Sequence, residues 1–187
     1  GLGGQNIESL KDGVKGLIEA LPENLEVTIV TTAPQPRFLV RPTMDKAMMI
    51  EGLSRLAPDS GAGRFVESMN EATQRIEKDK SDHFPIIISQ ATSSGDANVR
   101  DRDVKQIFER IQKRPTTVHV ILLNSTSGSA TGGANQTQVA LAVTQATRGR
   151  YESIAVPTRL ATLLPEFGKQ IATSHEKESH QFKITVE

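Results

Sequence analysis

Apolar side chains recur three or four positions apart in several stretches of the chain, the spacing that places them on one face of a helix. The first stretch begins at Asn6 and is followed by Pro22, and both are common helix boundary residues. Thr43 is expected to cap the second helix, Gly149 to end the fifth, and Pro165 to interrupt the last. The pattern predicts helices at residues 6–21, 44–56, 65–76, 101–113, 137–147 and 158–172.

Between these stretches the chain is rich in β-branched and other apolar residues, which favour strands. Residues 84–89 and 116–124 are apolar almost without a break, as is typical of strands buried on both faces of a sheet. Further strands are predicted at residues 25–32, 37–40, 150–154 and 180–187. Strands that alternate with helices predict an α/β fold in a single domain over residues 1–187, with a doubly wound, mainly parallel central sheet and helices on both faces.

In a doubly wound sheet, ligands bind at the loops that follow the carboxyl ends of the strands. Such loops are expected at residues 31–36, 89–99 and 124–135. Gly128 and Gly133 have the spacing of a phosphate-binding loop, but Ala134 and Asn135 stand where that motif needs lysine and a hydroxyl residue. A surface loop is therefore favoured, and a nucleotide- or phosphate-binding enzyme that uses residues 125–135 is an alternative.

The composition excludes several classes of function. Lys plus Arg and Asp plus Glu both number 22, so the chain lacks the positive excess of a nucleic-acid binder or a polybasic membrane-surface protein. Without cysteine it has no disulfide, thiol nucleophile or zinc–thiolate site. Its apolar runs fall short of the roughly 18 residues that a membrane span needs. We therefore expect no nucleic-acid partner and no membrane insertion.

Few side chains are placed for catalysis or metal binding. His175 and His180 are five positions apart, so they diverge around a helix instead of sharing one face. His119 is expected to be a core or edge histidine with one hydrogen bond. Asp101 and Asp103 fall in the first turn of a helix, where carboxylates complement the helix dipole. The methionines expected to fill the core are Met44, Met48 and Met49.

The order of these elements, and several segments within it, resemble the bacterial branch of the von Willebrand factor A domains. IESLKDGVKGLIEALPENLEVTIV is similar to the first helix and following strand of that family, and SGAGRFVESMNEA to its Gly-Gly-Thr loop and next helix. FPIIISQATSSGD stands where the family has a strand ending in Thr-Asp-Gly, and the segments from TTVHVILLN to HQFKITVE resemble the rest of the domain. The resemblance implies a further strand, upstream of residue 1, in the middle of the sheet, and it favours an exported protein, secreted or periplasmic.

Members of this family bind Mg²⁺ through an Asp-x-Ser-x-Ser loop, the Thr of Gly-Gly-Thr and the Asp of Thr-Asp-Gly, which are the oxygen ligands that this ion prefers. In this sequence the first motif is not present, Gly63 stands at the Thr position and Gln90 at the Asp position. The resemblance thus implies a degenerate metal site, so we expect no metal and no other cofactor. A metal-dependent adhesion domain completed by upstream residues is a second alternative.

The sequence therefore predicts a non-enzymatic protein-interaction or structural module of the von Willebrand factor A type. Because the expected loops are polar but not densely charged, the contact with a protein partner should consist of hydrogen bonds. The residues predicted to face that partner are Gly63, Arg64, Gln90, Thr92, Asp96, Ser127 and Thr131.

Overall fold

The structure is a computed structural model of the 187-residue chain. It describes residues 4–58, 63–81, 83–93, 99–124 and 130–179, without the side chains of residues 4, 5, 130–133, 178 and 179. The chain forms two compact units. The first includes residues 31–37 and 59–156, and the second includes residues 2–30, 38–58 and 157–187.

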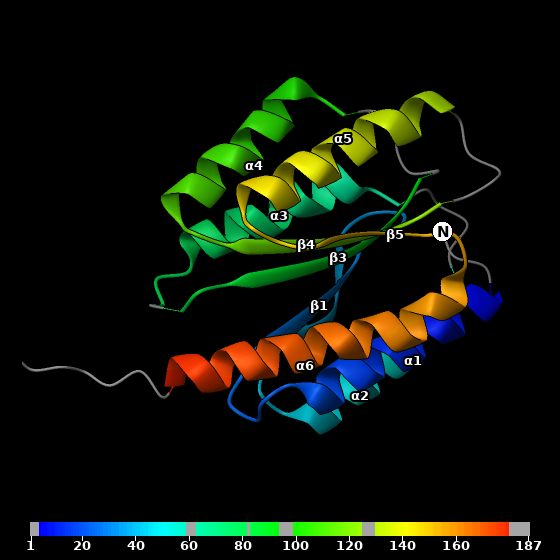
Figure 1. Ribbon diagram of the computed structural model, residues 1–187, viewed down its shortest axis with the longest axis vertical. Helices are drawn as coiled ribbons and strands as arrows, with labels where there is room; N and C mark the ends of the chain where they lie inside the picture. The colour runs from blue at the N-terminus through cyan, green and yellow to red at the C-terminus, as the bar shows by residue number, and fades with distance from the viewer. Residues whose placement is uncertain (1–3, 59–62, 82, 94–98, 125–129, 180–187) are drawn as a thin grey trace, which may run out of the picture. The chain divides into compact units, whose positions relative to one another are not determined.

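A three-stranded parallel sheet forms the centre of the first unit (Figure 1). β4 (Thr117–Leu123) lies in the middle and pairs with β3 (Ile86–Thr92) on one side and β5 (Tyr151–Ile154) on the other. Both pairs are parallel, which confirms the α/β fold class predicted from the alternating elements. The three strands consequently have their carboxyl ends at the same edge.

The two strands predicted to be buried on both faces differ in the structure. β4 is buried from Val118 to Leu123, as expected. The prediction was wrong for β3, which is mostly half-buried and has Ile86 44% exposed. The reason is position: β3 is an edge strand of the three-stranded sheet, whereas β4 has a neighbour on each side.

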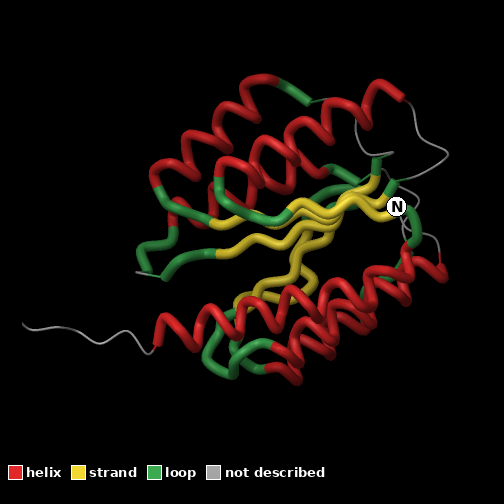
Figure 2. Tube along the Cα trace, viewed as in Figure 1, coloured by secondary structure: helices red, strands yellow, loops and turns green. Residues whose placement is uncertain are grey.

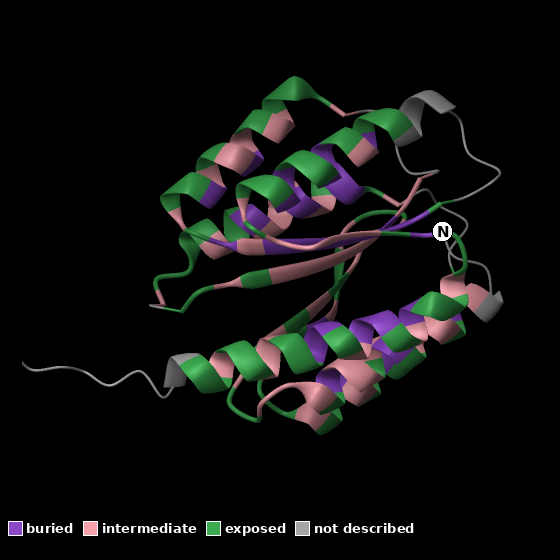
Figure 3. Ribbon diagram, in the orientation of Figure 1, coloured by how far each residue is buried: buried purple, intermediate pink, exposed green. Residues whose placement is uncertain are grey.

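Three helices cover one face of this sheet (Figure 1): α3 (Phe65–Lys78), α4 (Asp101–Lys113) and α5 (Ala130–Ala146). Figure 3 shows the buried residues along β4 and on the sides of the helices that face it. Their apolar side chains form one core, which includes Phe65, Met69, Ile107, Val120 and Val143. Burial of this apolar surface is the main force that holds the unit together.

The start of α5 corrects the predicted loop at residues 124–135. The helix begins at Ala130, not at 137, so Gly132 and Gly133 are helical. Two glycines disfavour a helix by roughly 1 kcal/mol each, but the alanines beside them and the packing of the helix on the sheet outweigh this. A loop that wraps a phosphate over the whole of residues 125–135 is therefore not what the chain forms.

The end of α5 is also capped differently from the prediction. Arg148, not Gly149, adopts the left-handed conformation, with φ of 54°. The Gly149 N–H donates to the Thr144 carbonyl (2.8 Å) and the Arg148 N–H to the Gln145 carbonyl (3.3 Å), the two bonds of a Schellman motif. Gly149 is needed for a different reason, since a Cβ there would overlap the carbonyl oxygen of Val118.

The second unit contains the remaining elements, except that the last residue of β1, Thr31, and the first residue of β2, Arg37, belong to the first unit. They are α1 (Gly4–Ala20), β1 (Val27–Thr31), β2 (Arg37–Thr43), α2 (Lys46–Ser54), the 3-10 turn η1 (Pro157–Arg159) and α6 (Leu160–Ser179). β1 and β2 form a two-stranded sheet. The upstream strand that the resemblance implies stays a prediction, and the strand predicted at 180–187 lies outside the described residues.

Helices α1 and α6 lie side by side (Figure 2) and approach closely at glycines. A Cβ at Gly13 would overlap the Leu160 carbonyl, and one at Gly16 would come within 2.5 Å of Pro165 Cγ. The predicted interruption of the last helix at Pro165 was wrong, because α6 continues through this residue. Its ring packs against Gly16 instead, and this contact with α1 compensates for the helical hydrogen bond that a proline cannot donate.

The start of α2 shows two further departures from the sequence-based expectation. Its N-cap is Asp45, not Thr43: the Asp45 carboxylate accepts from the N–H groups of Ala47 (2.8 Å) and Met48 (3.3 Å). Met49 is buried as predicted. Met44, before the N-cap, and Met48, in the first turn, are not core residues, since they are 56% and 57% exposed.

Candidate functional site

At the carboxyl edge of β3, β4 and β5, backbone hydrogen bonds continue past the ends of the strands. Beyond the paired strands, the Ser93 N–H donates to the Leu123 carbonyl (2.9 Å) and the Asn124 N–H to the Ile154 carbonyl (2.8 Å). The side-chain amide of Asn124 donates to Ser153 Oγ (2.9 Å), and both side chains are exposed. Hydroxyl and amide groups are thus held at this edge by the sheet itself.

Gln90 and Thr92 lie in the last three residues of β3, at the predicted edge. The half-buried Gln90 side chain donates from Nε2 to the carbonyl of Ala91 (2.8 Å). This bond holds the amide against its own strand. Thr92 ends the strand and is half-buried. Neither side chain carries a charge, so the edge of β3 offers neutral hydrogen-bonding groups where the resemblance would place a carboxylate.

Gly63 and Arg64 precede α3 and are joined to the segment that follows β1. The Arg64 N–H donates to the Thr32 carbonyl (3.0 Å), and a Cβ at Gly63 would lie 3.7 Å from Thr32 Oγ1. The exposed Arg64 guanidinium pairs with Glu67 (2.9 Å) in the first turn of α3. Because the pair is exposed, it orients the arginine more than it stabilises the fold.

The other predicted partner-facing residues give less information. Asp96 and Ser127 lie outside the described residues. Thr131 had been placed in a loop, but it belongs to the first turn of α5, and its side chain is not described.

Asn124, Ser153 and Thr32 were missed by the sequence analysis. Asn124 could have been found, since it is the polar residue directly after a fully apolar strand, whereas Thr32 reaches the start of α3 only through the fold.

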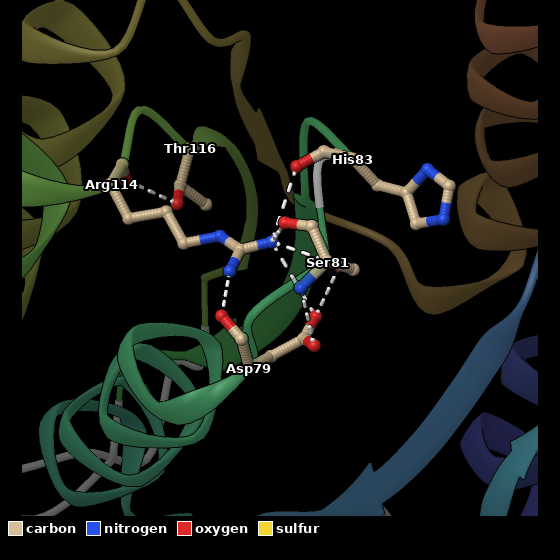
Figure 4. A network of polar contacts seen from close by, with 5 residues as sticks. All are labelled: Asp79, Ser81, His83, Arg114 and Thr116. Atoms are coloured by element: carbon tan, nitrogen blue, oxygen red, sulfur yellow. Dashed lines mark hydrogen bonds and ion pairs between the residues drawn. The ribbon is translucent and has the colours of Figure 1, made fainter.

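A separate polar network lies at the amino end of the sheet (Figure 4). Arg114, which follows α4, donates from Nη2 to the carbonyls of Ser81 (2.8 Å) and His83 (3.3 Å) and from Nη1 to the carbonyl of Asp79. Hydrogen bonds from Ser81, together with the positive charge of Arg114, lower the pKa of the Asp79 carboxyl. These contacts hold the connection between α3 and β3 against the end of α4, so Arg114 stabilises the fold.

Among the described residues, the groups with shifted pKa values are not arranged as an acid–base pair at the carboxyl edge. Burial and the charge of Arg150 lower the pKa of His119, in the first half of β4, and burial raises the pKa of Tyr151, the first residue of β5. A hydrogen bond from Lys113 lowers the pKa of Glu77 on α3. Within the described ranges, no group of three or more His, Asp or Glu side chains is close enough to hold a metal ion.

His119 is buried, as predicted, and its Nδ1 accepts a hydrogen bond from the N–H of Arg150 (3.0 Å). Asp101 and Asp103 lie in the first turn of α4, also as predicted. Among the helices in the described part of the chain, none is long and apolar enough to cross a membrane.

Comparisons with known proteins show which proteins share this fold. The model of the von Willebrand factor type A domain matches residues 1–91. No curated protein matches the chain. This match and the solved structures that share the fold confirm the resemblance to von Willebrand factor A domains, whereas the bacterial branch and the degenerate metal site stay predictions.

Those structures are related in fold but distant in sequence. A von Willebrand factor type A protein from Catenulispora acidiphila aligns with 89% of this chain at a TM-score of 0.71 and 16% identity, and this chain spans 38% of its length. BatB from Bacteroides thetaiotaomicron, described as a conserved hypothetical protein, aligns with 89% of this chain and 88% of its own (TM-score 0.61, 14% identity). The SpRpn10 VWA domain aligns with 83% of this chain and 82% of its own (TM-score 0.59, 14% identity).

Proposed function

We propose that this chain, which has the fold of a von Willebrand factor type A domain and matches that family's model over residues 1–91, is a non-enzymatic module that binds a protein partner. The binding surface is the carboxyl edge of β3, β4 and β5, together with Arg64 at the start of α3. The observation that carries the proposal is the edge formed by Thr92, Ser93, Asn124 and Ser153, which is polar, uncharged and fixed by the sheet.

This chemistry suits a protein surface better than a small charged ligand. Hydroxyl and amide side chains both donate and accept hydrogen bonds, so they match the peptide groups and polar side chains of another protein. The N–H groups of Ser93 and Asn124 are already paired within the sheet, and the exposed side chains of Asn124 and Ser153 are the groups that would make the contact. Arg64 adds one charged group that can hydrogen-bond to a carboxylate or a carbonyl of the partner.

The non-enzymatic part of the proposal is supported by the described side chains of the edge. They include no nucleophile beside a base and no pair of carboxylates, the arrangements that acid–base or covalent catalysis needs. The described groups with shifted pKa values lie on α3, in the connection after it, and in the first parts of β4 and β5.

The test compares variants of the edge with a matched variant away from it. The protein is immobilised, proteins captured from a native extract are identified, and the most enriched one is purified for affinity measurement. We expect Asn124→Ala and Arg64→Ala each to weaken its binding about tenfold, as for a central interface residue. Arg55→Ala removes an exposed arginine at the C-cap of α2 that pairs with Glu51, as Arg64 pairs with Glu67, and it should leave the affinity unchanged.

The proposal fails if every captured protein binds the two edge variants and the original chain equally well. Circular dichroism and unfolding midpoints of the variants establish that any loss of binding is not a loss of structure. A partner lost equally with Arg55→Ala would place the binding surface elsewhere and would also contradict the proposal.

A further inference from the structure

Gln136 on α5 is a buried amide without hydrogen bonds. Its side chain is 1% exposed, and neither Nε2 nor Oε1 has a hydrogen-bond partner among the residues that the structure describes. Proteins satisfy nearly all buried polar groups, and an unsatisfied one is costly. An apolar side chain of the same length would avoid this cost, so the amide at this position calls for a physical reason.

Its place in the fold is next to the carboxyl edge. Thr147, at the other end of α5, accepts a hydrogen bond from the Val118 N–H (3.1 Å) near the start of β4. Gln136 lies eleven positions earlier in the helix, or about 16 Å along its axis. For a helix that runs antiparallel along the strand, this length equals about five strand residues and corresponds to Leu122 and Leu123, the last residues of β4.

The same turn of α5 is incompletely packed on another side. A groove separates it from the start of α4, and Asn135 and Gln138 of this turn are exposed along it. The residues that line the groove are Val99, Asp101, Val104, Lys105, Asn135, Gln138 and Val139. One turn of the helix thus combines an unsatisfied amide on its buried side with open space toward α4.

We propose that residues 134–139 of α5 have a second position, displaced toward this groove, in which the amide of Gln136 is hydrogen-bonded. The observed position buries Val139 of this turn in the core but leaves the two polar atoms of Gln136 unsatisfied. The second position satisfies those atoms and exposes part of the apolar face. Each position gives up a favourable interaction that the other keeps, and a ligand that binds one position better than the other shifts the populations toward it.

The displaced turn adjoins the proposed binding edge, so a protein partner at the edge would select the second position by contacting the apolar face that this position exposes. This last step rests on the proposed function, but the existence of two positions does not. It follows from Gln136 and the groove alone and can be tested without a partner.

The experiment uses Gln136→Met, which keeps the length of the side chain and removes the two polar atoms. We expect the equilibrium constant for unfolding in urea to fall about tenfold, because the observed position no longer contains an unsatisfied amide. Hydrogen exchange of residues 134–139 should slow by at least a further factor of ten relative to the amides of β4. Gln145→Met, at an exposed position of the same helix, is the control and should change neither quantity.

Two results would overturn the inference. If Gln136→Met is no more stable than the original chain, the amide is already satisfied in the observed position. If the variant is more stable but exchange slows equally throughout the first unit, the helix has one position and not two. Edge variants that leave partner binding intact would contradict the proposed function while leaving the exchange result unaffected, so the two failures are distinguishable.

Discussion

Arg148 holds a backbone conformation that suits glycine. Its φ of 54° lies in the left-handed region, and this backbone conformation costs a non-glycine residue about 1–2 kcal/mol. Arg148→Gly should therefore raise the free energy of unfolding by about 0.5–1 kcal/mol, after allowance for the greater freedom of glycine in the unfolded chain. Urea unfolding monitored by circular dichroism measures this change.

The neighbouring glycine provides the opposite case. Gly149→Ala introduces a Cβ that overlaps the Val118 carbonyl, so the end of α5 must move away from β4. We expect the free energy of unfolding of this variant to be lower by about 2 kcal/mol or more. A stabilising Gly149→Ala or a destabilising Arg148→Gly would show that the chain leaves the helix by another route.

His119 makes the stability of the first unit depend on pH. Its lowered pKa means that the folded chain binds a proton less readily than the unfolded chain, whose histidine titrates near 6.5. The contribution of neutral His119 to the free energy of unfolding is therefore complete above pH 6.5. It is lost as the pH falls through that value toward the lower pKa of the folded state. Protonation would also remove the acceptor of the Arg150 N–H and add a charge beside the Arg150–Glu152 ion pair.

The measurement is the free energy of unfolding of the original chain and His119→Gln between pH 7.5 and 5. The original chain should lose stability over this range, and the variant, which cannot titrate at this position, should lose less. Equal slopes for both proteins would mean that other groups cause the pH dependence and that His119 titrates normally when folded.

At the scale of elements, Arg114 joins two segments, the end of α4 and the connection from α3 to β3 (Figure 4). Its guanidinium follows α4 and bonds the carbonyls of Asp79, Ser81 and His83 in the connection from α3 to β3. A lysine has one donor group in place of the planar fork and cannot bond these separated carbonyls together. We expect Arg114→Lys to lower the free energy of unfolding by about 1–3 kcal/mol.

Arg75→Lys is the matched control for this prediction. Arg75 is exposed and pairs with Glu71 within α3, and such a pair contributes about 0.5 kcal/mol or less. Chemical unfolding of both variants gives the comparison. Equal effects of the two substitutions would contradict a bridging role for Arg114.

The elements themselves could be predicted from the sequence because their signals are local. The apolar periodicity of residues 101–113 and the apolar run of β4 gave elements at or within one residue of those in the structure. Helix ends were less predictable, since Asp45 and Thr43 are both good capping residues and the fold decides which one the helix uses. The exposure of Ile86 depends on strand order, which no local pattern encodes.

For the whole molecule, the sequence indicated the edge where a site should lie but not how its residues are held. The carboxyl edge follows from alternating strands and helices, and Gln90 and Thr92 are found there. The link from Arg64 to Thr32 and the burial of Gln136 require contacts between segments distant in the chain. A glutamine in a stretch that looks like a polar loop gives no sign that the fold will bury it.

The metal-free interpretation can be tested on the whole protein by thermal unfolding. Because the resemblance places Gly63 and Gln90 at ligand positions, we expect the same midpoint in millimolar Mg²⁺ or Mn²⁺ as in a chelator, with ionic strength matched by NaCl. A site filled at about a hundred times its dissociation constant would add ~2.7 kcal/mol, or about 5–10 °C for a chain of this size. A rise of that extent with the divalent ions and not with NaCl would mean that other residues supply the ligands, and would favour a metal-dependent adhesion domain. An unchanged midpoint leaves the hydroxyl and amide groups of the edge as the chemistry available to a partner.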